Sequence, residues 1–291
     1  MNHFVKSDVG QLRWLLLKHA RDAFRDEKKI RSEWKRLNYS EQPDFDKALK
    51  EYDQFVQIFE DSGIQIHFLP PDETTSLDSI YVRDPLIVTP RGAVLGNMGK
   101  KERMTEPRVL YEILDNLRIP VLGMIEAPGC VEGGDVVMFD QETMAVGHGY
   151  RTNEEGIRQL REIIKDFIKE LIVVPLPHWD GPGDVLHLMS MISPVDYDLA
   201  VVYSRMMPVP FRQWLKQRSI QFLEVPDEEY GTLGCNILTI SPRKCLMIEG
   251  NSKTKELLEQ NAVKVLEYPG KEISLKGSGG PTCLTRPLRR D

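Results

Sequence analysis

Four residues of reactive types occur in this 291-residue sequence at places where a polar group needs an explanation. Cys283 follows a glycine-rich run in "GSGGPTC", and His187 lies within the apolar stretch "DVLHLMSM". Asp84 precedes a proline in "YVRDP", and Glu132 precedes two glycines in "VEGGD". Each alone fits a structural role, as a buried thiol, a hydrogen-bonded core histidine or a turn-forming acid. Together, the thiol, the imidazole and the two carboxylates favour nucleophilic catalysis by the cysteine.

The chemistry of this set predicts a cationic substrate. A cysteine attacks as the thiolate, and a histidine within reach can hold and deliver protons. Two carboxylates beside the thiol would oppose its ionisation, so we expect them to bind a cation. A guanidinium group is planar and rich in N–H donors, and carboxylates bind it in a bidentate fork. Its charge would also stabilise a thiolate without a strong external base, which explains a cysteine in place of a serine.

The other cysteines weigh against a disulfide or a metal as the role of Cys283. The chain has four cysteines and no CxxC pair: Cys130, Cys235, Cys245 and Cys283. This spacing is too sparse for a disulfide scaffold and unlike a structural zinc site. A buried thiol and a nucleophile remain as the two interpretations.

Composition excludes several classes of protein. Apolar residues make up 41% of the chain, which is enough to bury a core. The formal charge of −6 argues against a general nucleic-acid binder, which is usually basic over one face. No stretch approaches the roughly 18 apolar residues that a membrane span needs, and the N-terminus lacks a signal-peptide pattern. We therefore expect a cytoplasmic protein without nucleic-acid or membrane partners.

Alternating strands and helices must position the reactive residues. A strand pair, a helix and a further strand recur four or five times without a long linker, which predicts one α/β domain over 1–291 whose repeats close on themselves. Predicted strands cover 13–20, 64–70, 84–90, 92–98, 120–126, 171–177, 220–226 and 263–269, with strand pairs over 135–149, 184–203 and 235–250. Predicted helices cover 21–62 (with a break near 39–43), 106–117, 153–170, 207–218 and 252–261. His187 is thus placed inside a strand, and Asp84 at a strand end.

In this order, the motifs "YVRDP", "EGGDVV", "GYRTNEEGI", "HLMS" and "TCLTRPL" resemble the guanidino-group-modifying superfamily. That superfamily comprises arginine deiminases, dimethylarginine dimethylaminohydrolases and amidinotransferases, and the hydrolases are the most similar. The resemblance runs over nearly the whole chain. It implies the pentein fold, a five-bladed α/β propeller of ββαβ modules with pseudo-fivefold symmetry and a site in the central channel. A homodimer is also implied.

Matching the motifs gives each residue an implied role. Cys283 corresponds to the nucleophile and His187 to the general acid/base, while Asp84 and Glu132 correspond to the carboxylates that grip the guanidinium. Cys283 would form a thiouronium intermediate, and water activated by His187 would then release a ureido product such as citrulline. The implied reaction requires no metal and no organic cofactor.

Further residues have roles implied by their place in the same motifs. Arg151 and Arg103 correspond to the arginines that hold the substrate α-carboxylate, with Arg108 as a rival to Arg103. Asp135 is expected to order the Gly-Gly turn. The segments 8–11, 76–78 and 179–183 are candidates for a lid over the site.

Substrate choice rests on two conflicting residues. Deiminases usually carry an aspartate two residues after the histidine, but here Met189 stands there, and a thioether packs better against methyl groups than it accepts N–H donors. Arg83 gives the deiminase-like "RDP" pattern. We give Met189 more weight because it should face the reacting nitrogens, so methylated arginine is the preferred small-molecule substrate. Arginine deiminase, arginine dihydrolase, amidinotransferase, cysteine protease and a non-catalytic guanidine-binding protein remain alternatives.

Overall fold

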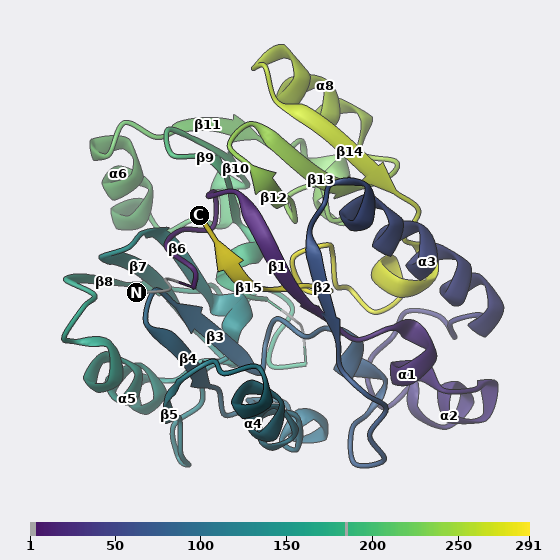
Figure 1. Cartoon of the computed structure of the whole chain (residues 1–291). Helices are drawn as coiled ribbons and strands as arrows, with labels where there is room; N and C mark the ends of the chain where they lie inside the picture. Colours follow the sequence, from purple (N-terminus) through teal and green to yellow (C-terminus); the bar gives the residue numbers. More distant parts are fainter. Residues whose placement is uncertain (1–3, 184–185) are drawn as a thin grey trace.

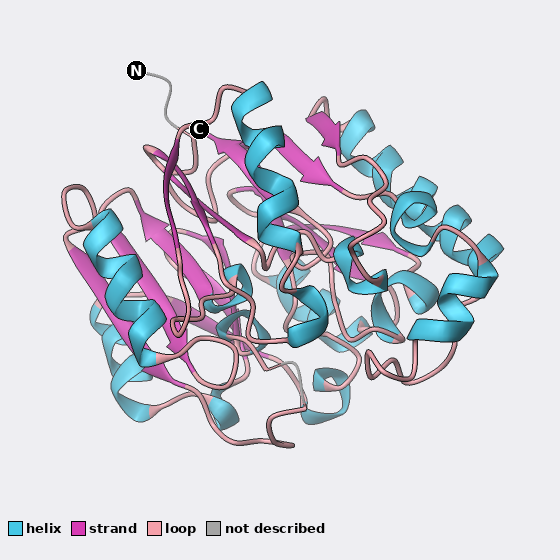
Figure 2. Ribbon diagram, turned by 90° about the horizontal axis from the view of Figure 1, so that it is seen from below, coloured by secondary structure: helices cyan, strands magenta, loops and turns pink. Residues whose placement is uncertain are grey.

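The computed structural model describes residues 4–183 and 186–291. Within these residues the strands form five three-stranded sheets that share one plan. Figure 1 shows the larger helices at the periphery of the molecule, and Figure 2 shows helices flanking the strands on several sides. None of the helices formed by the described residues combines the length and the apolar character that crossing a membrane requires.

One module illustrates the common plan. Strand β3 (Leu86–Thr89) pairs antiparallel with β4 (Gly92–Leu95), helix α4 (Glu106–Asn116) follows, and β5 (Val121–Met124) returns parallel to β4. The same order recurs in three more modules. The second module consists of β6 (Val136–Asp140), β7 (Thr143–His148), α5 (Glu154–Ile164) and β8 (Glu170–Pro175), and the third of β9 (Ile192–Asp196), β10 (Leu199–Val202), α6 (Val209–Gln217) and β11 (Gln221–Glu224). The fourth module consists of β12 (Leu238–Ser241), β13 (Lys244–Ile248), α8 (Ser252–Gln260) and β14 (Lys264–Tyr268). A short helix, α7 (Asp227–Tyr230), follows β11.

The remaining sheet joins the two ends of the chain. Strand β1 (Leu12–Leu17) lies between β2 (Gln65–Phe68), to which it is parallel, and β15 (Arg286–Arg290), to which it is antiparallel. Residue Leu15 faces Pro287 across the pair. Because β15 takes the place that β3 has in its own module, it completes a fifth ββαβ unit. The predicted five-module α/β propeller is therefore confirmed.

The helical region predicted over 21–62 is interrupted where the break near 39–43 was predicted, and a second interruption precedes Glu27, each helix after a break starting at an aspartate cap. It forms α1 (Ala20–Phe24), α2 (Glu27–Glu33) and α3 (Phe45–Asp61). The carboxylate of Asp26 accepts the backbone N–H of Lys29 at 2.7 Å, and that of Asp44 accepts the N–H of Lys47 at 3.0 Å. Each cap satisfies a free donor at a helix start and so favours a new helix there.

Several other element boundaries differ from the prediction. Helix α5 ends at Ile164, six residues before the predicted limit. The strand pair predicted over 184–203 is present as β9 and β10 but starts later than predicted: residues 184 and 185 lie outside the described residues, Leu188–Ser190 is a 3-10 helix, and β9 starts only at Ile192, so His187 is not inside a strand. Side chains satisfy this backbone in place of a neighbouring strand, because the N–H of Leu188 donates to Asp135 Oδ1 at 3.0 Å.

Two segments were also misjudged near the ends of the chain. The strand-like stretch before Asp84 contains the 3-10 helix Leu77–Ile80. Strand β15 was not predicted, since "RPLRR" carries a proline and three arginines and has no apolar alternation. Its arginines are accommodated individually: Arg290, which is buried, donates to the carbonyls of Gly10 and Thr239 at 2.7 and 2.6 Å.

Candidate active site

The predicted site residues occupy equivalent places in different modules. Asp84 precedes β3, Glu132 precedes β6, His187 precedes β9 and Cys283 precedes β15. Each therefore lies just ahead of the first strand of its module. Repetition of the module brings residues that are up to 199 positions apart in the sequence to one place in the molecule.

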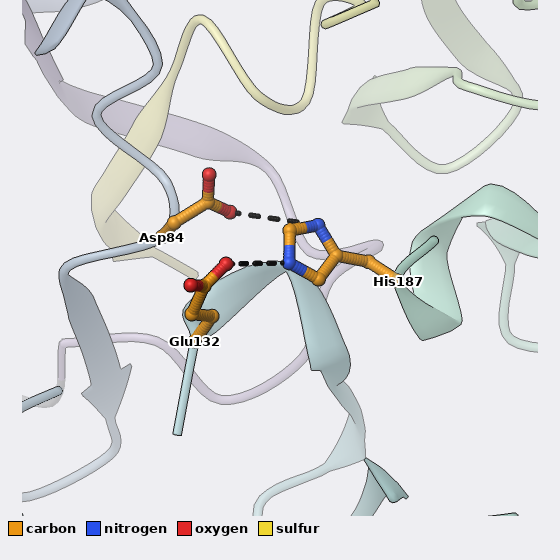
Figure 3. Close-up of side chains that lie close together, drawn as sticks. All are labelled: Asp84, Glu132 and His187. Atoms are coloured by element: carbon orange, nitrogen blue, oxygen red, sulfur yellow. Dashed lines mark hydrogen bonds and ion pairs between the residues drawn. The ribbon is translucent and has the colours of Figure 1, made fainter. Parts of the chain in front are cut away.

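The imidazole of His187 is held between the two carboxylates (Figure 3). Its Nε2 lies 2.8 Å from Glu132 Oε2, and its Nδ1 lies 3.9 Å from Asp84 Oδ1. All three side chains are buried. Within the part of the chain that the structure describes, Asp84 Oδ1 has no hydrogen-bond partner although it is buried. Its 3.9 Å contact with His187 is an ion pair too long for a hydrogen bond, so this buried oxygen can still accept the N–H groups of a cation.

Electrostatics make His187 and Glu132 an ion pair. Burial by itself would lower the pKa of His187, but the carboxylates of Asp84, Asp135 and Glu132 outweigh it and raise that pKa to about 9. Burial would likewise raise the pKa of Glu132, but the hydrogen bond and charge of His187 lower it to about 2. At neutral pH the imidazole is therefore protonated and its partner ionised.

Cys283 lies between two cavities. One, of about 150 Å³, is lined by Cys283 and His187 among others; the second, of about 80 Å³, is lined by Cys283 and Asp84. Burial raises the pKa of the Cys283 thiol, and the negative charge of Asp84 raises it further. The sulfur is thus a neutral thiol until a cation neutralises the carboxylates beside it.

Asn236 belongs to the same ring of residues, and the sequence analysis missed it. It precedes β12, the first strand of the module β12–β14. Its Nδ2 lies 3.5 Å from Cys283 Sγ, and its Oδ1 accepts from the backbone N–H and the hydroxyl of Thr282 at 3.1 and 2.8 Å. Asn236 therefore orients the cysteine. The sequence feature that could have identified Asn236 is its position, because it is a polar residue just ahead of the first strand of a module.

The glycines around the site allow close approach of other groups. A Cβ on Gly134 would lie 2.5 Å from His187 Nδ1, and a Cβ on Gly279 would overlap the ring of Tyr81. The Gly-Gly pair after Glu132 thus makes room for the imidazole. The glycine-rich run before Cys283 packs on an aromatic ring.

The two arginines of the carboxylate prediction both line the smaller cavity with Cys283. Arg103 is tightly held, since its guanidinium contacts Asp84 Oδ2 at 2.5 Å and both oxygens of Glu106 at 2.8 and 2.9 Å. Arg151 Nη1 lies 3.5 Å from both oxygens of Glu132. The rival, Arg108, lines a different cavity, so the geometry favours Arg103.

Comparison with known proteins identifies the family. Residues 23–290 match the model of the family described as N,N dimethylarginine dimethylhydrolase, eukaryotic. The chain belongs to this family. The prediction of a guanidino-modifying hydrolase that acts on C–N bonds is thereby confirmed.

Individual relatives of this dimethylarginine dimethylhydrolase family member agree with that assignment. The N(G),N(G)-dimethylarginine dimethylaminohydrolase of Pseudomonas aeruginosa is 28% identical over 243 residues, 84% of this chain and 89% of that protein. The arginine deiminase of Staphylococcus epidermidis is 25% identical over 256 residues, 72% of this chain and 61% of that protein. A dimethylarginine dimethylaminohydrolase crystallised as an adduct with S-methyl-L-thiocitrulline superimposes with a TM-score of 0.77, at 25% identity, over 97% of this chain and 100% of that chain.

In this family member, the residues used to judge the substrate lie in different surroundings. Met189 is buried and lines the larger cavity with His187 and Cys283. Arg83 instead pairs with Asp8 at 2.9 Å. The arginine of the "RDP" pattern is thus held in an internal ion pair and lines neither cavity at Cys283.

Asp135 has a wider role than the one expected. It is buried, and its Oδ1 accepts the backbone N–H of Leu188, the residue after His187. Burial raises the pKa of Asp135 to about 6. Asp135 is thus a positioning residue that ties the Gly-Gly turn to the segment carrying the imidazole.

The three lid candidates lie in unlike environments. Asp8 is buried in its ion pair with Arg83, so the segment 8–11 is part of the core and not a lid. Asp78, in the second segment, lines the smaller cavity and pairs with Lys100 at 2.6 Å, a polar pair that the sequence analysis missed. The third segment borders both cavities, through Trp179 and Gly183.

Proposed function

We propose that this protein hydrolyses the guanidino group of arginines, preferably N-methylated ones, through a covalent intermediate on Cys283. The products are citrulline and an amine, or ammonia when the substrate is arginine. The observation that carries this proposal is the position of Cys283, on one cavity with His187 and on a second with Asp84, whose Oδ1 accepts no hydrogen bond. Family membership supports the same reaction.

In the first half-reaction the substrate itself activates the enzyme. A guanidinium bound to Asp84 and Glu132 offsets the charge of Asp84 that keeps the pKa of Cys283 high, and the thiol releases its proton to solvent because His187 is already protonated. The thiolate attacks the guanidinium carbon. Protonated His187 donates its proton to the departing nitrogen, the C–N bond breaks, and a thiouronium remains on the sulfur.

In the second half-reaction His187 acts as a base. The imidazole has given up its proton, so it accepts one from a water that attacks the thiouronium carbon. The C–S bond then breaks, and the thiolate and citrulline are released. Asp84 and Glu132 hold the carbon in place through both halves, which is a positioning contribution.

The binding of the amino-acid end of the substrate is also part of the proposal. Arg103 and Arg151 would hold the α-carboxylate, and both lie on the cavity that Cys283 shares with Asp84. Met189 would face the alkylated nitrogen and so favour methylated substrates. Arginine deimination remains a second candidate, because an arginine deiminase is among the relatives.

We also propose that residues 1–291 act as a single catalytic domain, in the cytoplasm and as a homodimer. A sheet built from both ends of the chain supports a single unit. The sparse cysteines of the sequence support a reducing compartment, and the family resemblance supports a dimer. Light scattering on the purified protein tests the dimer.

Citrulline production tests the proposed reaction. We expect citrulline from monomethylarginine and asymmetric dimethylarginine and less from arginine, and we expect Cys283→Ser to lower kcat by roughly 10³-fold or more. Cys130→Ser is the matched control, because Cys130 is another partly exposed cysteine that lines neither cavity of the site. Normal turnover by folded Cys283→Ser would rule out this nucleophile, and efficient turnover of arginine alone would reassign the protein as a deiminase.

A further inference from the structure

The two cavities that meet at Cys283 differ in chemical character. The smaller one presents a set of charged groups: Asp78, Asp84, Lys100, Arg103 and Arg151. The larger one is lined mainly by apolar and aromatic side chains: Trp179, Leu186, Met189, Tyr230, Leu233 and Cys235. His187 is the only residue with a charged side chain among the described residues that line it. A substrate that reacts at the sulfur therefore has one polar and one apolar direction in which to extend.

The charged cavity matches the zwitterionic end of an arginine. Its guanidinium carbon then lies at Cys283, where the cavities meet, and any substituent on the terminal nitrogen points toward the other cavity. Both cavities also share Ser278, so they lie next to each other at the sulfur. This arrangement leaves the larger cavity for the group that departs with the nitrogen.

The aromatic wall of the larger cavity is firmly supported. Trp179 meets Tyr230 edge-on with ring centroids 5.9 Å apart, and Tyr230 stacks on Tyr203 at 4.0 Å with an interplanar angle of 18°. Packed rings present a flat apolar surface at low entropic cost. Such a surface suits a planar or cyclic hydrocarbon, and it attracts a positively charged alkylguanidinium.

The size of the larger cavity exceeds what two methyl groups need. Its volume is about 150 Å³. An apolar cavity of roughly that volume in a protein interior can hold a benzene molecule. The available space thus extends to a ring-sized substituent.

We propose that this larger cavity is a subsite for the N-substituent of the substrate, and that the enzyme hydrolyses arginines whose terminal nitrogen carries a group as large as a benzyl ring. The inference rests on the proposed function and defines its substrate class. Cys283 forms the C–S bond, the bond from carbon to the substituted nitrogen breaks, and His187 supplies the proton with which benzylamine leaves. Water then replaces sulfur on the carbon, as for the methylated substrates.

A substrate series tests the subsite. The kcat/KM values for Nω-methyl-, Nω-propyl- and Nω-benzyl-arginine would be measured through both citrulline and released amine. We expect kcat/KM for the benzyl substrate to lie within about 10-fold of that for the methyl substrate, because an apolar group that fits the cavity changes kcat/KM little. A value more than about 100-fold lower, with methylarginine still hydrolysed, overturns the subsite and leaves the proposed function intact. Absence of citrulline from all three overturns both.

Two glycine variants locate the subsite. Gly231 lines the larger cavity with φ −65°, and a Cβ there meets nothing within 4 Å, so Gly231→Leu adds bulk without a backbone clash. Gly183 lines the smaller cavity and is equally open, which makes Gly183→Leu the matched control. We expect Gly231→Leu to lower the benzyl-to-methyl ratio of kcat/KM at least ~10-fold and the control to change it less than about twofold. Equal ratios in both variants contradict the inference.

An acceptor amine is the competing use of the cavity. If added benzylamine receives the amidino group and a new substituted guanidine forms in place of citrulline, the larger cavity binds an acceptor, and the N-substituent assignment is overturned.

Discussion

At the residue scale, the protonation states of His187 and Cys283 govern the reactivity of the site. His187 carries a proton at neutral pH because its pKa is about 9, and burial together with Asp84 keeps the Cys283 thiol protonated as well. Without substrate, the site therefore holds a proton donor, His187, but its cysteine is a thiol and not a thiolate. Arg103 already pairs with Asp84, so a bound guanidinium would add further positive charge beside the sulfur, and we expect that charge to favour the thiolate.

Labelling of the thiol provides a test at this scale. We expect 2-chloroacetamidine, a cation, to label Cys283 at neutral pH at least ~10-fold faster than neutral chloroacetamide, after correction for reactivity with a free thiol. Labelling by the neutral reagent should rise with pH toward a midpoint above about 8.5, the pKa of an ordinary thiol. Mass spectrometry locates the label, with Cys130 as the internal reference. Equal corrected rates would contradict activation by a cation.

Residue types alone were sufficient to find the reactive set but not the residues that support it. A thiol, an imidazole and two acids in turns or apolar stretches indicate chemistry because each is costly without a partner. Asn236 and Asp78 are ordinary polar residues whose importance depends on contacts 47 and 22 positions away, with Cys283 and Lys100. The motif around Arg83 likewise gave no sign of its ion pair with Asp8, which lies 75 positions away in the sequence.

At the scale of elements, the first strand of each module delivers one polar residue to the centre. Hydrophobic periodicity predicted most strands and helices, because a strand pair and an amphipathic helix each have a local pattern. Strand β15 has none, since Arg290 is stabilised by carbonyls of Gly10 and Thr239 that lie far away in the sequence. Tertiary contacts of this kind cannot be read from a five-residue stretch.

Truncation of a core side chain in β15 tests its role. Leu288 is fully buried, so Leu288→Ala should lower the free energy of unfolding by about 3 kcal/mol. It should also lower kcat, because β15 follows Cys283 directly. Arg289→Ala is the control, since Arg289 is exposed on the same strand and its loss should change stability by less than about 0.5 kcal/mol. Chemical denaturation of both variants gives the comparison, and equal stabilities would mean that β15 does not hold the sheet together.

For the whole molecule, the buried imidazole links stability to pH. The pKa of His187 is about 9 in the folded protein, whereas an exposed histidine in the unfolded chain has a pKa of about 6.5. The folded state binds this proton more tightly, so the stabilisation is complete below pH 6.5 and is lost as the pH rises to 9. The effect on the free energy of unfolding is on the order of 3 kcal/mol.

Thermal unfolding across that window measures the linkage. We expect the Tm of the wild type to fall between pH 6.5 and 9, and His187→Gln to show a shallower fall, because its amide can still donate to Glu132 but does not titrate. Parallel curves for the two proteins would show that His187 is not the group responsible.

During synthesis, strand β1 cannot gain its antiparallel neighbour until residues 286–290 have been made. The sheets formed by β3 to β14 can assemble earlier. Cys283 lies three residues ahead of Arg286, so the sulfur and the closing strand are synthesised almost together. A chain made only as far as residue 282 therefore has Asp84, Glu132 and His187 but lacks the proposed nucleophile.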